Sequence, residues 1–294
     1  MEINAAAMLR KRVAAVLNTS SGGCDETSAA KMRAVLDRAG LGHATIRAVA
    51  ADEIDAALDE AIGAADVLVV LAGDGTIMTA AEKCGAGSVL LIPLPGGTMN
   101  MLPKALYGPH GWEQILSDSL ADPEVRTLSG GKAGDRLFYC VAILGTPTLW
   151  ADAREALRRL DLAGAVKRSV TAIRRSGSNK LSYELGDSVK GSAEAVAVIC
   201  PMVSRVLAED ARTLEAVALN PETAAEVVRL ALHAMLDDWR NDASVERAKV
   251  KTVKVTGHGR IPVILDGETV RMGRSVTINF QPVAFRALAP AHRP

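Results

Sequence analysis

The stretch that decides the fold is Asp66-Val67-Leu68-Val69-Val70-Leu71-Ala72-Gly73-Asp74-Gly75-Thr76. A short β-branched run comes first, and the helix-compatible segment 77–83 follows Gly-Asp-Gly-Thr, which predicts a strand, a tight turn and a helix. Two glycines let backbone N–H groups approach an anion, and the start of a helix adds partial positive charge. The Asp74 carboxylate has no reason to touch phosphate directly, which points to a bridging divalent cation or an orienting hydrogen bond. A purely structural tight turn is the alternative.

The first third of the chain alternates apolar runs with amphipathic segments. This alternation predicts a parallel sheet covered by helices, with ligands at the carboxyl ends of the strands. Strands are expected at 13–17, 43–49, 67–71 and 89–93, and helices around 32–39, 54–62 and 79–83.

After about residue 126 the expected strands mostly lack helical connections, which favours an antiparallel sheet or sandwich. They lie at 126–128, 138–144, 181–185, 193–199, 214–219, 249–255, 261–265 and 275–280. One helix is expected near Asn220-Pro221, with an apolar stripe from Val228 to Trp239 interpreted as core packing. We therefore predict domains at 1–125 and 126–280, with the tail 281–294 as a candidate to return to the first.

Bulk composition excludes several classes of protein. Lys plus Arg and Asp plus Glu both total 34 among 294 residues, so no overall charge attracts nucleic acid or an anionic membrane. The four cysteines form no Cys-x-x-Cys pair, which indicates small buried side chains in a reducing compartment. No segment reaches the ~18 apolar residues of a membrane span, so a soluble, cytoplasmic protein is predicted.

Three further segments turn the opening stretch into a pattern. The loop 18–23 is rich in hydroxyl groups and glycine, which suits phosphate oxygens. The segment 95–100 offers Thr98 and Asn100 beside Gly97. Far downstream, Asp266-Gly267-Glu268 places two acids around a glycine, although Asp-Gly there is also typical of a hairpin turn.

In this order the four segments resemble the diacylglycerol kinase catalytic family, which includes bacterial lipid kinases and sphingosine kinases. That family carries Asn-Pro-x-Ser-Gly, Gly-Gly-Asp-Gly-Thr, Gly-Thr-x-Asn-Asp and a late Asp-Gly-Glu. The resemblance implies a Rossmann-like α/β nucleotide-binding domain followed by an antiparallel β-sandwich substrate domain. It also implies transfer of the ATP γ-phosphoryl group to a lipid hydroxyl such as that of diacylglycerol.

The resemblance further implies roles for individual residues. Glu268 is the expected general base, and Asp74 is expected to hold the nucleotide together with catalytic Mg²⁺. The expected nucleotide-binding residues are Asn18, Thr19, Ser20, Ser21, Gly22, Gly73, Asp74, Gly75, Thr76, Ile77, Met78, Thr79 and Thr98. A structural Mg²⁺ or Ca²⁺ is expected at Leu207, Asp210 and Arg212, with a solvated acidic turn as the alternative because Ala211 replaces the family's glycine.

The sequence also departs from the family pattern. Ala72 replaces the first glycine, Met78 and Thr79 replace Asn-Glu, and Met101 replaces the last Asp. In segment 138–145, Cys140 and Ile143 replace Asn and the inner Gly of Phe-x-Asn-x-x-Gly-x-Gly. Because Asp74, Thr76, Thr98 and Glu268 are retained, we expect an active but divergent kinase. An NAD kinase-like enzyme and a non-catalytic nucleotide- or lipid-binding relative are the alternatives.

A basic segment bears on the acceptor. Residues 154–180 hold eight basic residues (Arg154, Arg158, Arg159, Lys167, Arg168, Arg174, Arg175 and Lys180) against only Glu155 and Asp161. Such a segment fits a solvated helix and loop, or a surface that contacts anionic headgroups at the inner membrane surface. Nucleic acid is not expected because no aromatic platform is interleaved there. A homo-oligomer is compatible with the sequence but not indicated by it.

Overall fold

The computed structural model describes residues 11–145, 180–204, 206–208, 211–219 and 245–291. The chain divides into two compact units, the first made of 1–130 with 281–294 and the second of 131–280. The chain passes from the first unit to the second within strand β5 (Pro123–Ala133) and returns within strand β16 (Ser275–Pro290).

The first unit is built on a parallel sheet whose strands follow the order β2-β1-β3-β4-β16. The strands are β1 (Val13–Asn18), β2 (Thr45–Val49), β3 (Val67–Ala72), β4 (Leu90–Pro95) and the Gln281–Pro290 part of β16. Every residue of β1 and β3 is buried, as expected of strands that are covered on both faces.

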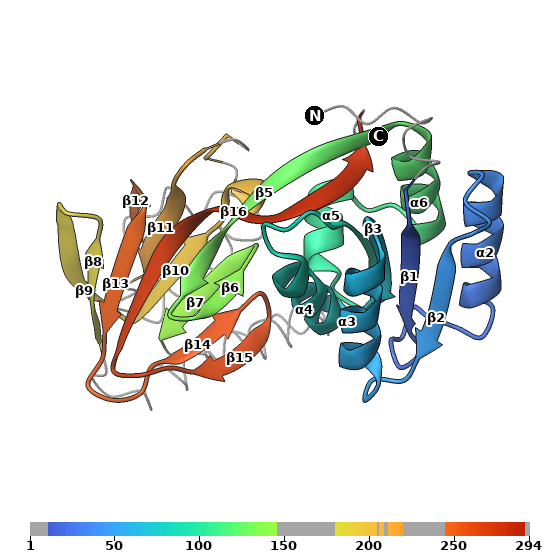
Figure 1. Ribbon diagram of the computed structural model, residues 1–294. Helices are drawn as coiled ribbons and strands as arrows, with labels where there is room; N and C mark the ends of the chain where they lie inside the picture. Colours follow the sequence, from blue (N-terminus) through green and yellow to red (C-terminus); the bar gives the residue numbers. More distant parts are fainter. Residues whose placement is uncertain (1–10, 146–179, 205, 209–210, 220–244, 292–294) are drawn as a thin grey trace, which may run out of the picture. The chain divides into compact units, whose positions relative to one another are not determined.

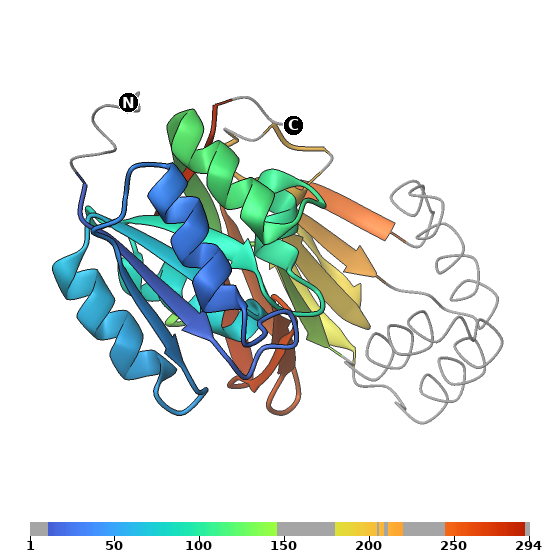
Figure 2. The ribbon, with the colours of Figure 1, turned by 90° about the vertical axis from the view of Figure 1, so that its right-hand side faces the viewer.

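Helices cover both faces of this sheet. They are α2 (Ser28–Arg38), α3 (Ile54–Ala64), α4 (Asp74–Cys84), α5 (Met101–Tyr107) and α6 (Trp112–Ala121). In the sheet order β2-β1-β3-β4, the connection from β1 to β2 runs toward one edge of the sheet and that from β3 to β4 runs toward the other. Because both connections are right-handed crossovers, α2 and α4 lie on opposite faces of the sheet. Figure 1 shows α3 across the sheet from α2, and Figure 2 shows α2 lying beside α6.

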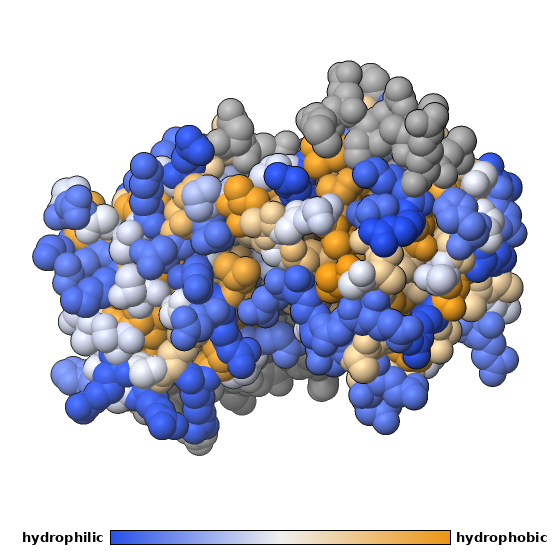
Figure 3. All heavy atoms as spheres, viewed as in Figure 1, coloured by the Kyte–Doolittle hydropathy of each residue, from blue (hydrophilic) through white to orange (hydrophobic). Residues whose placement is uncertain are grey.

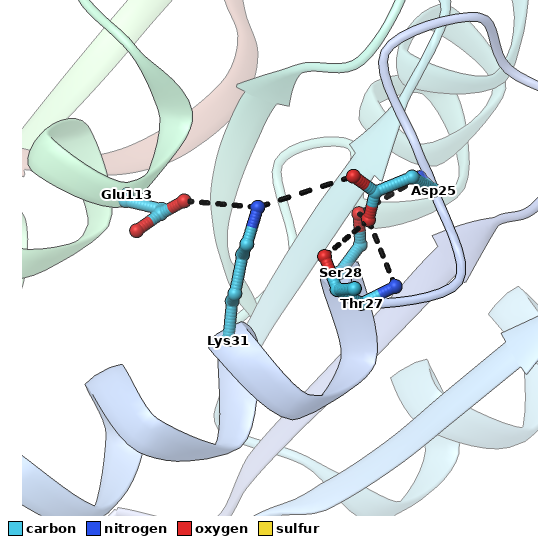
Figure 4. Close-up of polar contacts among 5 residues, drawn as sticks. All are labelled: Asp25, Thr27, Ser28, Lys31 and Glu113. Atoms are coloured by element: carbon cyan, nitrogen blue, oxygen red, sulfur yellow. Dashed lines mark hydrogen bonds and ion pairs between the residues drawn. The ribbon is translucent and has the colours of Figure 1, made fainter.

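A polar cluster organises the turn that leads into α2 (Figure 4). The Asp25 Oδ1 atom accepts hydrogen bonds from the Thr27 N–H at 2.9 Å and from the Thr27 hydroxyl at 2.7 Å, and the Ser28 hydroxyl donates to it at 2.9 Å. The Asp25 N–H returns a bond to Ser28 Oγ, a reciprocal exchange like that of a capping box. Lys31 lies 3.9 Å from both Asp25 and Glu113 of α6.

The second unit contains an antiparallel six-stranded sheet of order β12-β11-β10-β7-β14-β15. Its strands are β7 (Val141–Gly145), β10 (Ala195–Ile199), β11 (Leu214–Leu219), β12 (Val245–Val250), β14 (Pro262–Leu265) and β15 (Glu268–Arg271). The opposing sheet of this unit orders the first part of β16, β13 (Thr252–Thr256), β8 (Leu181–Leu185) and β9 (Val189–Ala193), and β5 ends in a hairpin with β6 (Arg136–Phe138).

The core of the second unit lies between these two sheets. Apolar residues alternate inward along β13, where Val253 and Val255 are buried, and along β14, where Val263 and Leu265 are buried. The aromatic ring of Phe138 covers Gly131 on the neighbouring strand, where an added Cβ would lie 2.1 Å from the ring. The mixed α/β fold with a C-terminal antiparallel sandwich is therefore confirmed.

Several element boundaries differ from the sequence expectations. The expected strand 249–255 is wrong, because β12 and β13 are separate strands broken at Lys251. The short helices α5 and α6 and the strands β9 and β15 were not expected, while the segment 126–128 is part of the much longer β5. The expected helix near Asn220 lies outside the described residues, as does its stripe from Val228 to Trp239.

No helix in the described part of the chain is long and apolar enough to cross a membrane. Most of the face in Figure 3 is hydrophilic, with separate apolar areas. Among the described residues, Val206 is the one large hydrophobic side chain that is exposed.

Candidate functional site

The predicted phosphate site lies at the carboxyl ends of three neighbouring strands of the first unit. Leu17 of β1 pairs with Leu71 of β3, and Ala72 of β3 pairs with Pro95 of β4, so the loops that follow these strands begin at the same edge of the sheet. The chain leaves β1 and β3 in opposite directions, which makes the gap between their ends a topological switch point. Open α/β sheets bind ligands at such points.

Backbone contacts between the three loops require glycine. The Gly23 N–H donates to the Gly96 carbonyl at 2.8 Å, and the Gly96 N–H donates to the Ala72 carbonyl at 2.9 Å. A Cβ added to Gly96 would lie 2.7 Å from the Ala72 nitrogen, and one added to Gly97 would lie 2.7 Å from the Gly73 Cα. The loops therefore approach more closely than any side chain would permit.

Asn18 and Ser21 connect the first loop to the Gly-Asp-Gly-Thr turn. The Asn18 Nδ2 donates to Thr76 Oγ1 at 3.2 Å, and Asn18 Oδ1 accepts the Ser20 N–H at 3.0 Å. Ser21 Oγ accepts the Gly73 N–H at 3.0 Å. Asn18 is buried, and its amide holds residues on both sides of the switch point, Ser20 after β1 and Thr76 after β3.

Asp74 joins the Gly-Asp-Gly-Thr turn to the third loop, which follows β4 at residues 96–100. Its carboxylate accepts the backbone N–H of Asn100 at 2.9 Å and that of Met101 at 2.6 Å. These donors stand at the start of α5, where a negative charge is favourable. Asn100 adopts the left-handed conformation, with φ of 52°, and its side chain exchanges two 2.8 Å hydrogen bonds with Gly97. The sequence did not predict that Asp74 and Asn100 would hold these two loops together by hydrogen bonds to the backbone.

The other predicted residues of the first unit lie around this network in different ways. Thr19 Oγ1 donates to the Val49 carbonyl, and Ser20 Oγ accepts the Ala51 N–H, so both anchor the end of β2. Gly75 and Thr98 are exposed, Gly22 has open space around it, and Thr79 Oγ1 donates to the Gly75 carbonyl. Met78 is half-buried, whereas Ile77 is fully buried and its N–H donates to the Gly73 carbonyl at 3.1 Å.

Glu268 belongs to the second unit and is the exposed first residue of β15. The turn that precedes it has positive φ at Asp266 (46°) and at Gly267 (97°), as a two-residue type I′ hairpin requires. The hairpin interpretation of Asp-Gly is therefore confirmed. The turn also brings segment 266–268 against segment 138–145. The buried Asp266 carboxylate accepts the backbone N–H groups of Tyr139, Cys140 and Val141.

The expected structural metal site falls partly outside the described residues, since Asp210 is among those not described. Leu207 is buried, and its N–H donates to Ser204 Oγ, which in turn donates to the buried Glu215 at 2.6 Å. The described residues contain no group of three or more His, Cys, Asp or Glu side chains able to hold a metal ion. The sequence reasoning missed the Ser204–Glu215 bond, which no local motif signals.

The basic segment also lies almost entirely outside the described residues. Of its eight basic residues only Lys180 is described, and it is exposed. Of the four cysteines, Cys84, Cys140 and Cys200 are buried as expected, whereas Cys24 is only partly buried. Burial raises the pKa of Cys84 to about 11.

Comparisons with known proteins agree with this architecture. Residues 12–133 match the model of the diacylglycerol kinase catalytic domain. A solved diacylglycerol kinase from Bacillus anthracis str. Sterne aligns with a TM-score of 0.72 and 14% identity, covering 97% of this chain and 99% of its own. Two other structures from the same strain align with TM-scores of 0.71 and 0.72 at 18% and 17% identity, and cover 97% and 95% of this chain and 99% and 97% of their own. No curated protein sequence matches the chain at a significant level.

At these identities the solved structures show a shared fold. The family model shows more, because it spans the three strand ends and the loops that follow them. The match to the diacylglycerol kinase catalytic domain covers residues 12–133, which form most of the first unit. These residues are therefore similar to the catalytic domain of a family of kinases.

Proposed function

We propose that this protein is an ATP-dependent lipid kinase that transfers the γ-phosphoryl group to a lipid hydroxyl such as that of diacylglycerol. The observation that carries the proposal is that three loops are hydrogen-bonded to one another at the carboxyl edge of the parallel sheet. There the side chains of Asn18, Ser21 and Asp74 tie three loops together at the topological switch point. The family match over the same residues supports it.

The proposed nucleotide site is centred on the start of α4. The first N–H groups of a helix have no acceptor within the helix, and the helix dipole makes this end attractive to phosphate. Thr76 Oγ1 already accepts a hydrogen bond from Asn18, so its own proton is available for a phosphate oxygen. Thr98 is exposed at the neighbouring loop, where its hydroxyl can contact the same ligand.

The residues at this edge fit a magnesium ion. An ionised carboxylate has about four acceptor positions, and Asp74 uses one on each oxygen for the N–H groups of Asn100 and Met101. Mg²⁺ is commonly held by one or two carboxylates together with substrate phosphates. We therefore assign Asp74 to the cation as well as to the third loop. The ion would supply charge neutralisation at the transferring phosphoryl group.

Glu268 is the proposed general base. The lipid hydroxyl oxygen forms a bond to the γ-phosphorus, the bond from that phosphorus to the β–γ bridging oxygen breaks, and the hydroxyl proton passes to the Glu268 carboxylate. The products are ADP and a phosphorylated lipid. The exposure of Glu268 on a short hairpin leaves its carboxylate accessible to a substrate hydroxyl, as geometry first requires of a base.

A lipid acceptor would be met at a membrane surface. We propose that the basic segment 154–180 provides the attraction to anionic headgroups, each basic residue contributing about 1 kcal/mol near such a surface. Sedimentation with anionic vesicles that weakens as salt rises would support this contact. Binding that is indifferent to vesicle charge would contradict it.

The enzymatic proposal is tested by a panel of acceptors. Mg²⁺-dependent transfer from ATP is measured to diacylglycerol, a sphingoid base, a lipid monoalcohol and NAD in parallel. Phosphorylation of a lipid hydroxyl supports the proposal, and phosphorylation of NAD alone indicates the NAD kinase-like alternative. ATP binding without transfer to any acceptor would indicate a non-catalytic relative.

A pair of variants assigns the base. Glu268→Gln removes one negative charge from the second unit and should lower the rate of transfer about 10²–10⁴-fold while ATP binding persists. Glu184→Gln is the matched control, because Glu184 of β8 pairs with Lys190 at 3.1 Å and belongs to the opposite sheet of the same unit. Its transfer rate should remain that of the wild type.

A further inference from the structure

A buried side chain, that of Asp266, holds the turn that precedes Glu268 against residues 139–141 of the same unit. Asp266 is 2% exposed, and its Oδ2 accepts the Tyr139 N–H at 2.6 Å. Its Oδ1 accepts the N–H groups of Cys140 at 2.9 Å and of Val141 at 2.7 Å. Three consecutive backbone donors therefore converge on one buried carboxylate, and charge-assisted bonds of this kind are the strong ones.

The Asp266 side chain also completes the ladder between β14 and β7. In that ladder Leu265 pairs with Ala142, and the next step joins the Asp266 N–H to the Val141 carbonyl at 2.9 Å. A continued strand would return a bond from the Val141 N–H to a backbone carbonyl. Here the Asp266 Oδ1 takes that place, because the backbone has already turned into the left-handed region at φ 46°.

Glu268 follows this anchored residue directly. It is the first residue of β15 and pairs with Leu265 across the turn. Among the described residues no hydrogen bond or ion pair holds its exposed carboxylate. The turn therefore sets the backbone position from which that side chain extends, and the turn is held by Asp266 from one side and by the β14–β15 pairing from the other.

We infer that Asp266 is a positioning residue, whose carboxylate holds the β14–β15 turn against the backbone of residues 139–141 and thereby places Glu268 for proton transfer. This inference rests on the proposed function of Glu268. Misplacing a catalytic group by a small distance lowers the rate of the chemical step much more than it weakens nucleotide binding. A purely structural role would instead lower stability and leave the turnover of the folded protein unchanged.

The test is Asp266→Asn, which keeps the size of the side chain. The amide oxygen can still accept N–H groups, but the amide nitrogen replaces an acceptor with a donor. We expect kcat for lipid phosphorylation to fall at least 10-fold while KM for ATP stays within about 2-fold. Amide hydrogen exchange at Tyr139, Cys140 and Val141 should accelerate. Val255→Ala, a cavity-forming change in the buried core of the same unit, should lower stability without lowering kcat.

A double variant shows whether Asp266 affects kcat through Glu268. If Asp266 acts through Glu268, the Asp266→Asn/Glu268→Gln double variant should be no slower than Glu268→Gln alone. A further fall in the double variant, or an equal fall in kcat for Val255→Ala, would overturn the inference. Wild-type kcat in Asp266→Asn together with a strongly lowered kcat in Glu268→Gln would overturn it as well, and would leave the proposed function intact.

Two other results complete the test. Absence of transfer by the wild type, or full activity of Glu268→Gln, would contradict the proposed function and this inference together. If Asp266→Asn does not fold, Gly267→Ala takes its place, because alanine is strained at the Gly267 φ of 97° while the Asp266 carboxylate is retained. The same loss of kcat is then expected, and an unchanged kcat would overturn the inference.

Discussion

Asp74 and Met101 stand 27 positions apart in the chain, and the Oδ1 atom of Asp74 accepts the backbone N–H of Met101 at 2.6 Å. The Gly-Asp-Gly-Thr turn and the Gly-Thr-x-Asn segment are consequently one structural unit. The sequence departure at Met101 is therefore compatible with this contact, because the donor is a backbone group that every residue except proline supplies.

Removing the Asp74 acceptors should loosen the third loop. Asp74→Ala deletes both acceptors and should lower the free energy of unfolding by about 1–3 kcal/mol. Asp74→Asn retains one carbonyl oxygen and should cost less. Urea denaturation measures the two free energies of unfolding. An Asp74→Ala variant as stable as the wild type would show that the bonds from Asp74 to Asn100 and Met101 do not stabilise the loop.

The close approach of the loops predicts a strong effect at Gly97. Gly97→Ala places a Cβ 2.7 Å from the Gly73 Cα, so backbone must move, and overpacking of this kind costs about 1–3 kcal/mol. ATP affinity should fall with stability. The control is Gly63→Ala in α3, where nothing lies within 4 Å of the added Cβ and a gain of about 0.5–1 kcal/mol is expected. Calorimetric titration with ATP and thermal unfolding report both properties.

Tyr107 of α5 contributes a hydrogen bond to the part of β16 that lies in the first unit. Its buried hydroxyl donates to the Leu288 carbonyl at 3.1 Å, and burial raises the pKa of Tyr107 far above its ordinary value, so the hydroxyl stays protonated. Tyr107→Phe should cost about 1 kcal/mol through the lost bond. An unchanged denaturation midpoint would show that this bond does not contribute.

The turn before α2 gives stability a dependence on acid pH. Hydrogen bonds from Thr27 and Ser28 lower the pKa of Asp25 to about 2, from an ordinary value of 3.8. Because the folded-state pKa is depressed, the stabilisation is complete above pH 3.8 and is lost as pH falls toward 2. The difference in melting temperature between the wild type and Asp25→Asn should therefore shrink from pH 5 to pH 2. A constant difference would contradict this assignment.

Much of the fold was predictable because hydrophobic periodicity reports burial directly. The buried runs 13–17 and 67–71 appear as the central strands β1 and β3, and helix α3 matches its apolar stripe at 54–62. The ends of these strands carry the glycine-rich and serine-rich loops, so the edge that brings the loops together was predictable as well.

The remaining features depend on contacts between distant segments. Helix α5 spans only seven residues with Pro103 inside it, and β15 has four residues that are mostly exposed, so neither leaves a clear periodic signal. The separation of β12 from β13 at Lys251 is set by their different partners, β11 and β16. The bonds of Asp74 to α5 and of Asp266 to residues 139–141 join segments 26 to 127 positions apart, which no local pattern encodes.

We propose that this chain transfers a phosphoryl group from ATP to a lipid hydroxyl with Glu268 as the base. The most direct measurement incubates γ-labelled ATP, Mg²⁺ and dispersed diacylglycerol with the wild type and with Glu268→Gln, and follows the label into extracted lipid. We expect labelled lipid with the wild type and strongly reduced labelling with Glu268→Gln, a variant that should still bind ATP. Equal labelling by both proteins, or no labelled lipid alcohol with the wild type, would contradict it.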